Sequence, residues 1–316
     1  MALGTNHQTV TTADKFIPEI WSDEVVATYK KNLVLANLIK KLSFKGKKGD
    51  TLHIPKPGRG SANAKSAATQ VTLNTDTATE INVLIDQHWE YSILIEDIVE
   101  VQALASMRQF YTDDAGYALA RKVDSKLIEL GRGVNGGDAT AAYTAAYLGS
   151  NGTTAYVAAS NNEAALTDAA IRRSIQRLDD NDVPMDGRFL IVPPSTRNTL
   201  MGIARFTEQA FVGEAGSNNT IRNGEVGNLY GMPVFVSSNA DFGAGNSGAD
   251  RIALMGHRDS MVLVEQQGIR AQTQYKQEYL GTLFTSDTIY GVQALRTSAS
   301  AGAATSSAAF ALAVPA

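Results

Sequence analysis

Four histidines and one short acidic run are the parts of this sequence whose residue types suggest metal chemistry. His7, His53, His88 and His257 lie far apart, and no pair has the i, i+4 spacing of a zinc-binding His-Glu-x-x-His helix. No carboxylate cluster accompanies them, so histidines with ordinary hydrogen-bond partners are favoured over a metal site. The acidic run, LDDND at 178–182, lacks the glycine and the bidentate glutamate of a calcium loop, which favours a helix end and a turn.

A glycine-rich hexapeptide, GRGVNG at 131–136, matches the G-x-G-x-x-G phosphate pattern. A dinucleotide site needs a strand before the first glycine and a helix after the last, because the pyrophosphate binds at the helix N-terminus. Here the glycines follow a predicted helix and lead into a loop, so Gly131 is interpreted as a left-handed helix stop. A nucleotide-binding enzyme remains the least favoured hypothesis.

Composition narrows the functional classes further. The chain has no cysteine, which excludes disulfides, thiolate metal sites and thiol catalysis. A net charge of −4 argues against general coating of nucleic acid, and 44% hydrophobic residues suffice for one large domain or two modest ones. The N-terminus lacks a signal-peptide pattern, and no apolar run approaches the length of a membrane span. We therefore expect a soluble protein that is made in a cytoplasm and has no catalytic residue, cofactor or metal.

The elements that would position any functional residues begin with a helical pattern that starts at Pro18 and ends in the basic stretch 40–50. A short strand at 51–57 and a long alternating strand at 81–95 flank about twenty small, polar residues. Hairpin loops usually hold about 2–5 residues, so this loop predicts an extended arm. Such an arm has little to bury against its own domain, and we expect a neighbouring molecule to cover it.

One long helix is predicted over 97–130, with an apolar stripe and a length of about 50 Å at about 1.5 Å per residue. A loop-like region over 131–165 follows, and a second helix starts at Thr167 and Asp168. The remaining strands are predicted in RFLIVPP, GMPVFVSS, IALMGHRDSMVLVEQQG and TIYGVQALR. Residues 297–316 are a low-complexity tail rich in Ala and Ser. Helices and strands mix without regular βαβ alternation, which predicts an α+β fold.

Several stretches, taken in order, resemble the major capsid proteins of tailed bacteriophages with the HK97-type fold. They are IPEIWSDEVVATYKKNLVLANLI, KGDTLHIPK, DQHWEYSILIEDI, YALARKVDSKLI, LDDNDVPMDGRFLIVPPSTRNTLMG, GNLYGMPVFVSSNA and YGVQALR. The shared order and spacing across roughly residues 17–296 carries the resemblance.

The resemblance implies a role for each part of the chain. It implies an N-terminal arm and helix at 1–47, an E-loop hairpin at 48–92, a peripheral domain with a spine helix at 93–165, an axial domain at 166–254, peripheral return strands at 255–296 and the C-terminal tail at 297–316. It also implies an icosahedral shell of hexamers and pentamers around double-stranded DNA. Another self-assembling phage protein, of a tail tube, a sheath or a decoration, is the alternative.

Candidates for contacts between subunits come from the N-terminal arm, the E-loop hairpin and the one basic run. They are Trp21, Lys40, Lys41, Lys47, Lys48, Lys56, Arg59 and Lys65. The basic run is either a solvated face or a contact with acidic neighbours or packaged DNA. The resemblance further implies a portal protein, a possible decoration or cement protein and, because no scaffolding segment precedes the recognisable arm, a separate scaffolding protein. It places the protein in the virion capsid, after synthesis in the host bacterial cytoplasm, with no membrane partner.

Overall fold

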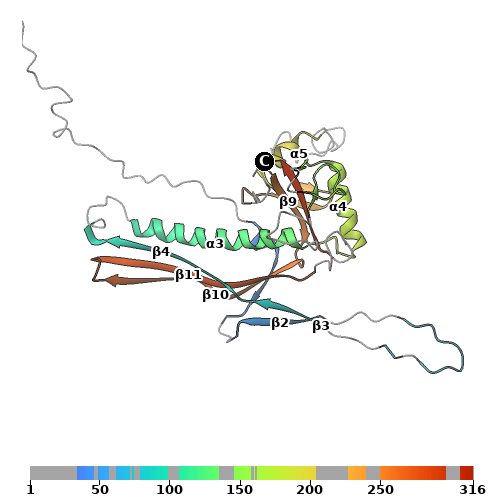
Figure 1. The fold of residues 1–316 in the computed structure, drawn as a ribbon, viewed down its shortest axis with the longest axis horizontal. Coiled ribbons are helices and arrows are strands. Elements are labelled where there is room, and N and C mark those ends of the chain that lie inside the picture. Colours follow the sequence, from blue (N-terminus) through green and yellow to red (C-terminus); the bar gives the residue numbers. More distant parts are fainter. Residues whose placement is uncertain are drawn as a thin grey trace, which may run out of the picture.

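The structure is a computed structural model that describes residues 34–45, 49–56, 62–71, 73–74, 79–98, 107–134, 146–157, 160, 162–203, 227–239, 250–296 and 307–315. Figure 1 shows three parts: a long helix beside a twisted sheet, a more compact unit with a second sheet, and a two-stranded arm that projects from the body. Helices and strands alternate irregularly along the chain, so the α+β prediction is confirmed.

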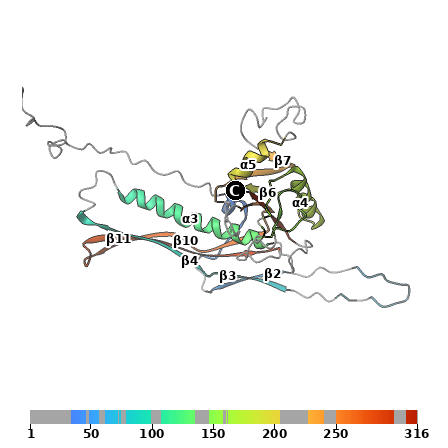
Figure 2. The same cartoon turned by 45° about the horizontal axis from the view of Figure 1, so that its top comes forward.

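The first sheet has four strands in the order β1-β10-β11-β4. They are β1 (Lys40–Ser43), β10 (Met261–Lys276), β11 (Gly281–Ala294) and β4 (Gln87–Glu96). The long helix α3 (Met107–Gly133) runs along one face of this sheet (Figure 2). Its Leu127 and Ile128 are buried in one cluster with Leu263 of β10 and Tyr290 of β11. This packing fixes the helix against the sheet.

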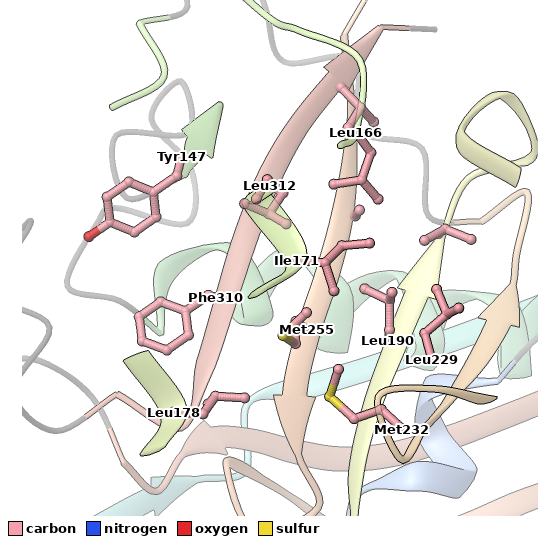
Figure 3. Close-up of a cluster of buried hydrophobic side chains, with 14 of the residues drawn as sticks. Tyr147, Leu166, Ile171, Leu178, Leu190, Leu229, Met232, Met255, Phe310 and Leu312 are labelled. Atoms are coloured by element: carbon pink, nitrogen blue, oxygen red, sulfur yellow. The ribbon is translucent and has the colours of Figure 1, made fainter. Parts of the chain in front are cut away.

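The second sheet has six strands in the order β5-β12-β9-β6-β8-β7. They are β5 (Tyr147–Leu148), β12 (Ala309–Pro315), β9 (Asp250–His257), β6 (Arg188–Val192), β8 (Met232–Val236) and β7 (Asn228–Leu229). Helices α4 (Asp168–Asp180) and α5 (Pro194–Met201) belong to the same unit. The predicted start of α4 is confirmed, since the Thr167 hydroxyl accepts a hydrogen bond from the Ala170 amide. Figure 3 shows Ile171 of α4 near Met255 of β9 in the core.

The two sheets share a hydrophobic core, although they are separate in hydrogen bonding. The cluster that contains Leu127 and Leu263 also contains Phe189 of β6 and Leu254 of β9. The predicted strand, turn and strand over 252–268 are present, but β9 and β10 lie in different sheets. The turn between them therefore carries the chain from one sheet to the other.

The interpretation of the C-terminal tail as a low-complexity segment missed a strand. Residues 309–315 form β12, which pairs with both β9 and β5 inside the six-stranded sheet. Phe310, Leu312 and Val314 alternate with Ala311 and Ala313, so the large side chains pack on one face and the alanines on the other. Both faces are buried, and the alanines are small enough to pack against neighbouring strands. A composition rich in Ala concealed a period-two pattern.

The single long strand predicted over 81–95 was also wrong. The chain divides it into β3 (Thr79–Leu84), which pairs with β2 (Thr51–Lys56), and β4, which pairs with β11. Between them Ile85 is buried, and its amide donates to the Asp50 carbonyl at 2.8 Å. The chain crosses β11 at Gly291, where an added Cβ would lie 2.4 Å from the Leu84 carbonyl oxygen. A glycine is therefore required at this crossing.

The bounds of two predicted helices differ from those in the structure. The described part of α3 covers 107–133, so the helix ends three residues beyond the predicted end at 130. At the predicted start, β4 ends at Glu96, residues 97 and 98 are helical, and 99–106 lie outside the described residues. Gly131 is not a left-handed stop: it lies inside the helix, where a Cβ would meet Leu254 Cδ2 at 2.8 Å. Of the predicted N-terminal helix, only the turn α1 (Leu35–Leu38) is described before the chain enters β1.

We predict that Gly291→Ala destabilises the folded subunit by about 1–3 kcal/mol, because the new methyl group would overlap backbone atoms at the crossing. Gly116→Ala in α3 is the matched control, since its Cβ would have no heavy atom within 4 Å. In a helix interior that change should stabilise by up to about 1 kcal/mol. Urea unfolding of the unassembled subunit measures both changes. Equal unfolding midpoints for the two variants would show that the crossing is not tight.

We predict that Phe310→Ala costs about 3–5 kcal/mol of unfolding free energy, because the ring is fully buried in the core of the six-stranded sheet. Val71→Ala, at a position 60% exposed on the arm, should change the free energy by less than about 0.5 kcal/mol. The same unfolding measurement compares them. A loss below about 1 kcal/mol for Phe310→Ala would argue against a packed C-terminal strand.

Candidate inter-subunit surfaces

The projecting arm is fixed to the body at its base. Phe44, Val83 and Ile85 are buried there together with Val262 and Val264 of β10. Beside this cluster, the Gln266 side-chain amide donates to the Gly49 carbonyl at 3.0 Å. The base therefore belongs to the body of the subunit, and the direction of the arm follows from these contacts.

Beyond its two strands the arm is uncovered. All the described residues of the loop, 62–71 and 73–74, are exposed, including Val71 at 60% and Leu73 at 85%. Two side-chain hydrogen bonds lie within this loop: the Asn63 side chain donates to Asn74 at 2.7 Å, and the Thr69 hydroxyl donates to the Ser66 carbonyl at 2.7 Å. The described tip therefore has contacts within itself and presents the apolar side chains of Val71 and Leu73 to water.

The predicted contact residues fall in two places. Lys40 and Lys41 are exposed on β1, where Lys41 Nζ donates to the Asn37 side chain at 3.2 Å. Lys56 is exposed at the end of β2, and Lys65 is exposed in the loop of the arm. The structure does not gather these lysines into one site. Trp21, Lys47, Lys48 and Arg59 lie outside the described residues.

The far end of the four-stranded sheet carries an apolar patch that sequence reasoning missed. Ile98, Tyr279 and Leu280 are 60–66% exposed, and Tyr275 is 48% exposed. The Asp97 amide donates to the Leu280 carbonyl at 3.0 Å, and the Tyr275 hydroxyl donates to the Asp97 carboxylate at 2.7 Å. The hydrogen bond to this carboxylate raises the pKa of Tyr275. Large apolar side chains in the short turn at 277–280, where polar residues are usual, were the available signal.

A second missed feature is the ion pair between Arg270 and Asp287. Two guanidinium nitrogens, Nε and Nη2, donate to the two carboxylate oxygens at 3.0 and 2.9 Å, and the Gln267 side chain adds a third bond at 2.9 Å. The hydrogen bond from Arg270 is the main reason that the pKa of Asp287 lies below its usual value. The group sits at a β-bulge, because the register of β10 on β11 shifts between Glu265 and Arg270. The pair ties the two strands together across this irregularity.

A buried carboxylate on the long helix joins three elements. Asp124 is 0% exposed and accepts hydrogen bonds from the Leu35 and Ala36 amides at 2.9 and 3.2 Å. Its other oxygen accepts from the Asn239 side chain at 2.9 Å. Burial raises the pKa of Asp124, and these three hydrogen bonds oppose the rise. Asp124 thereby attaches the turn α1 and the segment after β8 to α3.

The residues considered for chemistry have local structural partners. His257 Nε2 lies 2.8 Å from the Asp186 carbonyl, and its Nδ1 accepts from the Asp259 amide at 3.1 Å. His53 lies 3.1 Å from Glu80, and His88 lies 3.4 Å from Asp287. Within the described residues, His, Asp and Glu form no group of three that could hold a metal ion. Residue His7 lies outside the described residues.

The acidic and glycine-rich runs also have structural roles. The run 178–182 closes α4, which ends at Asp180 with Asn181 as its C-cap, so the predicted helix end is confirmed. The glycines at 131 and 133 belong to the C-terminal end of α3, whereas phosphate groups bind at helix N-termini. None of the helices in the described part of the chain has the length and apolarity needed to cross a lipid bilayer.

Solved structures share this architecture at low sequence identity. A chain from Mycobacterium phage Che8 matches with a TM-score of 0.69 and 21% identity, covering 94% of this chain and 97% of that chain. The capsid structure of cyanophage P-SCSP1u matches with a TM-score of 0.72 and 18% identity, over 99% and 96% of the two chains. The head structure of Helicobacter pylori bacteriophage KHP40 matches with a TM-score of 0.70 and 11% identity, over 99% of each. The fold is therefore that of phage capsid proteins, as the HK97-like prediction stated.

The comparison with protein families gives the same result from sequence. No curated protein matches the chain. A family model described as "Phage capsid protein" matches residues 35–294, which run from α1 to the end of β11. The chain belongs to the phage capsid protein family.

Proposed function

We propose that this protein is the major capsid protein of a tailed phage and that it assembles as hexamers and pentamers into an icosahedral shell around double-stranded DNA. The observation that carries the proposal is the arm, whose described tip is fully exposed although its base is packed into the body. An arm that leaves its own subunit and ends in exposed Val71 and Leu73 fits a contact in which one copy reaches onto the next.

The shape of the subunit supports assembly through unlike surfaces. The arm and the turn between β10 and β11 lie at opposite ends of the described part of the molecule (Figure 1). Tyr279 and Leu280 of the far apolar patch belong to this turn. A contact between two different surfaces repeats head to tail and closes into a ring where the rotation allows. Each contact can be modest, because every subunit engages several neighbours at once.

The parts of the chain take the following roles in this proposal. The hairpin of β2 and β3 is the E-loop, although it ends at Leu84 because the rest of the predicted 48–92 region forms β4. Helix α3 and the four-stranded sheet form the peripheral domain. The six-stranded sheet with α4 and α5 forms the axial domain. We add β5 and β12 to the predicted range 166–254, because β12 pairs with both β5 and β9. Lys40, Lys41, Lys56 and Lys65 remain contact candidates at exposed positions.

The proposal includes partners beyond further copies of the chain. We propose synthesis in the bacterial cytoplasm, a separate scaffolding protein, a portal protein, a possible decoration protein and non-specific contact with packaged DNA. The subunit is proposed to build the shell without catalysing a reaction.

Expression of this chain alone tests the need for a scaffolding protein. It should give irregular assemblies, and uniform closed shells of native size would contradict a separate scaffold. Electron microscopy of purified assemblies distinguishes shells from the rods of a tube or sheath protein.

We predict that deletion of residues 58–70 leaves a folded subunit but prevents stable shell formation. The nine residues left between β2 and β3 (57 and 71–78) can still close the hairpin, because shortening a loop costs little. Circular dichroism and urea unfolding of the subunit test the fold, and electron microscopy tests assembly. Met185→Ser, at a position 73% exposed before β6, is the control and should assemble normally. Normal particles from the deletion variant would refute the role of the arm.

A further inference from the structure

The first described turn of the chain is capped by a residue from a distant helix. Amides at the start of a helical turn have no partner within the turn, so a side chain just before it commonly accepts from them. Val34 precedes α1 and has no side-chain acceptor. Instead Asp124 of α3 accepts from the Leu35 and Ala36 amides, with its Oδ1 atom at 2.9 and 3.2 Å. The path of the chain at α1 is therefore set by a contact with α3.

The capping carboxylate is itself held in one orientation. Asp124 Oδ2 accepts from the Asn239 side-chain amide at 2.9 Å, and Asn239 Oδ1 accepts from the Ser125 hydroxyl at 3.3 Å. The Asn239 backbone amide donates to Ser237 Oγ at 3.1 Å. Asp124, Ser237 and Asn239 are all buried. Each carboxylate oxygen thus has its own donors, and the carboxylate cannot rotate without losing hydrogen bonds.

Stability alone does not explain a buried carboxylate at this place. Leu35 and Ile39 are buried in one cluster with Leu127 and Ile128 of α3, so apolar packing already holds the turn on the helix. Removing a carboxylate from water is costly, and the hydrogen bonds to it mainly offset that cost. Hydrogen bonds differ from packing in that they require a particular direction. The carboxylate therefore specifies the geometry of the turn.

The geometry of this turn matters for the segment that precedes it. Residues 1–33 lie outside the described residues and join the body at Val34. They include Trp21, one of the candidates for contacts between subunits. A segment attached at a loose point would sample many directions, and ordering it on a neighbour would cost conformational entropy. An attachment point of fixed position and direction lowers that cost.

We propose that Asp124 is a positioning residue for assembly, because it fixes the point and the direction in which the N-terminal segment leaves the subunit. This inference rests on the proposed function, since it assigns the residue a part in building the shell. Asp124 needs no contact with a neighbouring copy for this role, because it acts through Leu35 and Ala36. Its loss should therefore reduce assembly more than it reduces the stability of the subunit.

Asp124→Asn tests the role with little change in shape. The new side chain has only one oxygen, so a donor must then face either the Asn239 side chain or the two amides of α1. The subunit should fold, and the yield of shells in sedimentation and electron microscopy should fall at least about tenfold. Ile171→Val, which removes one buried carbon atom from the core of the six-stranded sheet, controls for lost stability. It should lower the urea unfolding midpoint and keep the yield within about twofold.

A double variant gives the rescue. Asp124→Asn together with Asn239→Asp exchanges donor and acceptor, so the amide at 124 can donate to the carboxylate at 239 and still accept from Leu35 and Ala36. The Ser125 hydroxyl keeps its acceptor. The yield of shells should return to within about twofold of that of the unmodified chain. A folded double variant without recovery, or yields that follow the urea midpoint across all the variants, would overturn the positioning role.

Spin labels report the position of the turn directly, because the chain has no native cysteine. Cysteines in place of Asn37 of α1 and Arg121 of α3, both exposed, carry one pair of labels. Cysteines in place of Glu90 and Gln272, exposed on the four-stranded sheet, carry a reference pair. Asp124→Asn should broaden the distance distribution of the first pair and leave that of the reference pair unchanged. An unchanged first pair, or equal broadening of both, would contradict a local positioning role.

Hydrogen exchange on the unmodified chain adds a readout that no substitution can disturb. The Leu35 and Ala36 amides should exchange at rates within about tenfold of those of the buried Leu127 and Ile128 amides of α3. Rapid exchange at both would overturn the fixed attachment. Normal shells from Asp124→Asn would overturn the positioning role and leave the proposed function intact. A wild-type chain that forms rods, or no assembly under any condition, would overturn the proposed function itself.

Discussion

The passage of the chain from β3 to β4 sets the direction in which the arm leaves the body. The proposed contact of the arm with a neighbouring subunit depends on that direction. At this crossing the backbone of Leu84 and Ile85 lies directly over Gly291 of β11, with no room for a side chain between them. Ile85 is buried, and its amide is bonded to Asp50 at the start of the hairpin. The two strands of the arm thereby leave the sheet as a pair, in a direction fixed by packing.

A fixed arm requires a rigid body, and the shared core supplies it. Leu127, Leu254 and Leu263 come from α3 and from both sheets, yet they are buried in one cluster. Asp124 adds a polar connection in the same region, because its two oxygens accept from α1 and from Asn239. A buried carboxylate loses its hydration, and these hydrogen bonds compensate for that loss. A change of angle between the sheets would disrupt both the packing and this junction.

The arm and the far apolar patch, in contrast to the core, leave apolar side chains exposed. Val71, Leu73, Tyr279 and Leu280 are apolar but uncovered in the single subunit. Apolar groups gain free energy when they leave water, at roughly 25 cal/mol per Å², so contact between copies would supply what the single fold does not. Small, separate patches favour reversible contacts over one strong interface. Reversible contacts let a large assembly correct errors as it grows.

Local signals in the sequence were enough to determine many elements. Thr167 begins α4, and Pro193 and Pro194 follow the end of β6. The strand β2 at 51–56 ends one residue before the predicted strand 51–57. The order and spacing of the short motifs resembled those of the phage capsid family, and the family match over residues 35–294 confirms that resemblance. The low self-burial of the arm was foreseeable, since its loop contains few side chains able to form a core.

Only the tertiary structure decided how distant segments pair. The alanines of β12 form a central strand because β5 and β9 flank them, and nothing near residue 309 in the sequence indicates those neighbours. The break at Ile85 depends on Gly291, which lies about two hundred residues away, and the Arg270–Asp287 pair depends on the register of β10 on β11. Strand register and sheet order arise from contacts between residues far apart in the chain. A pattern within one segment determines its conformation, but it does not determine its partner.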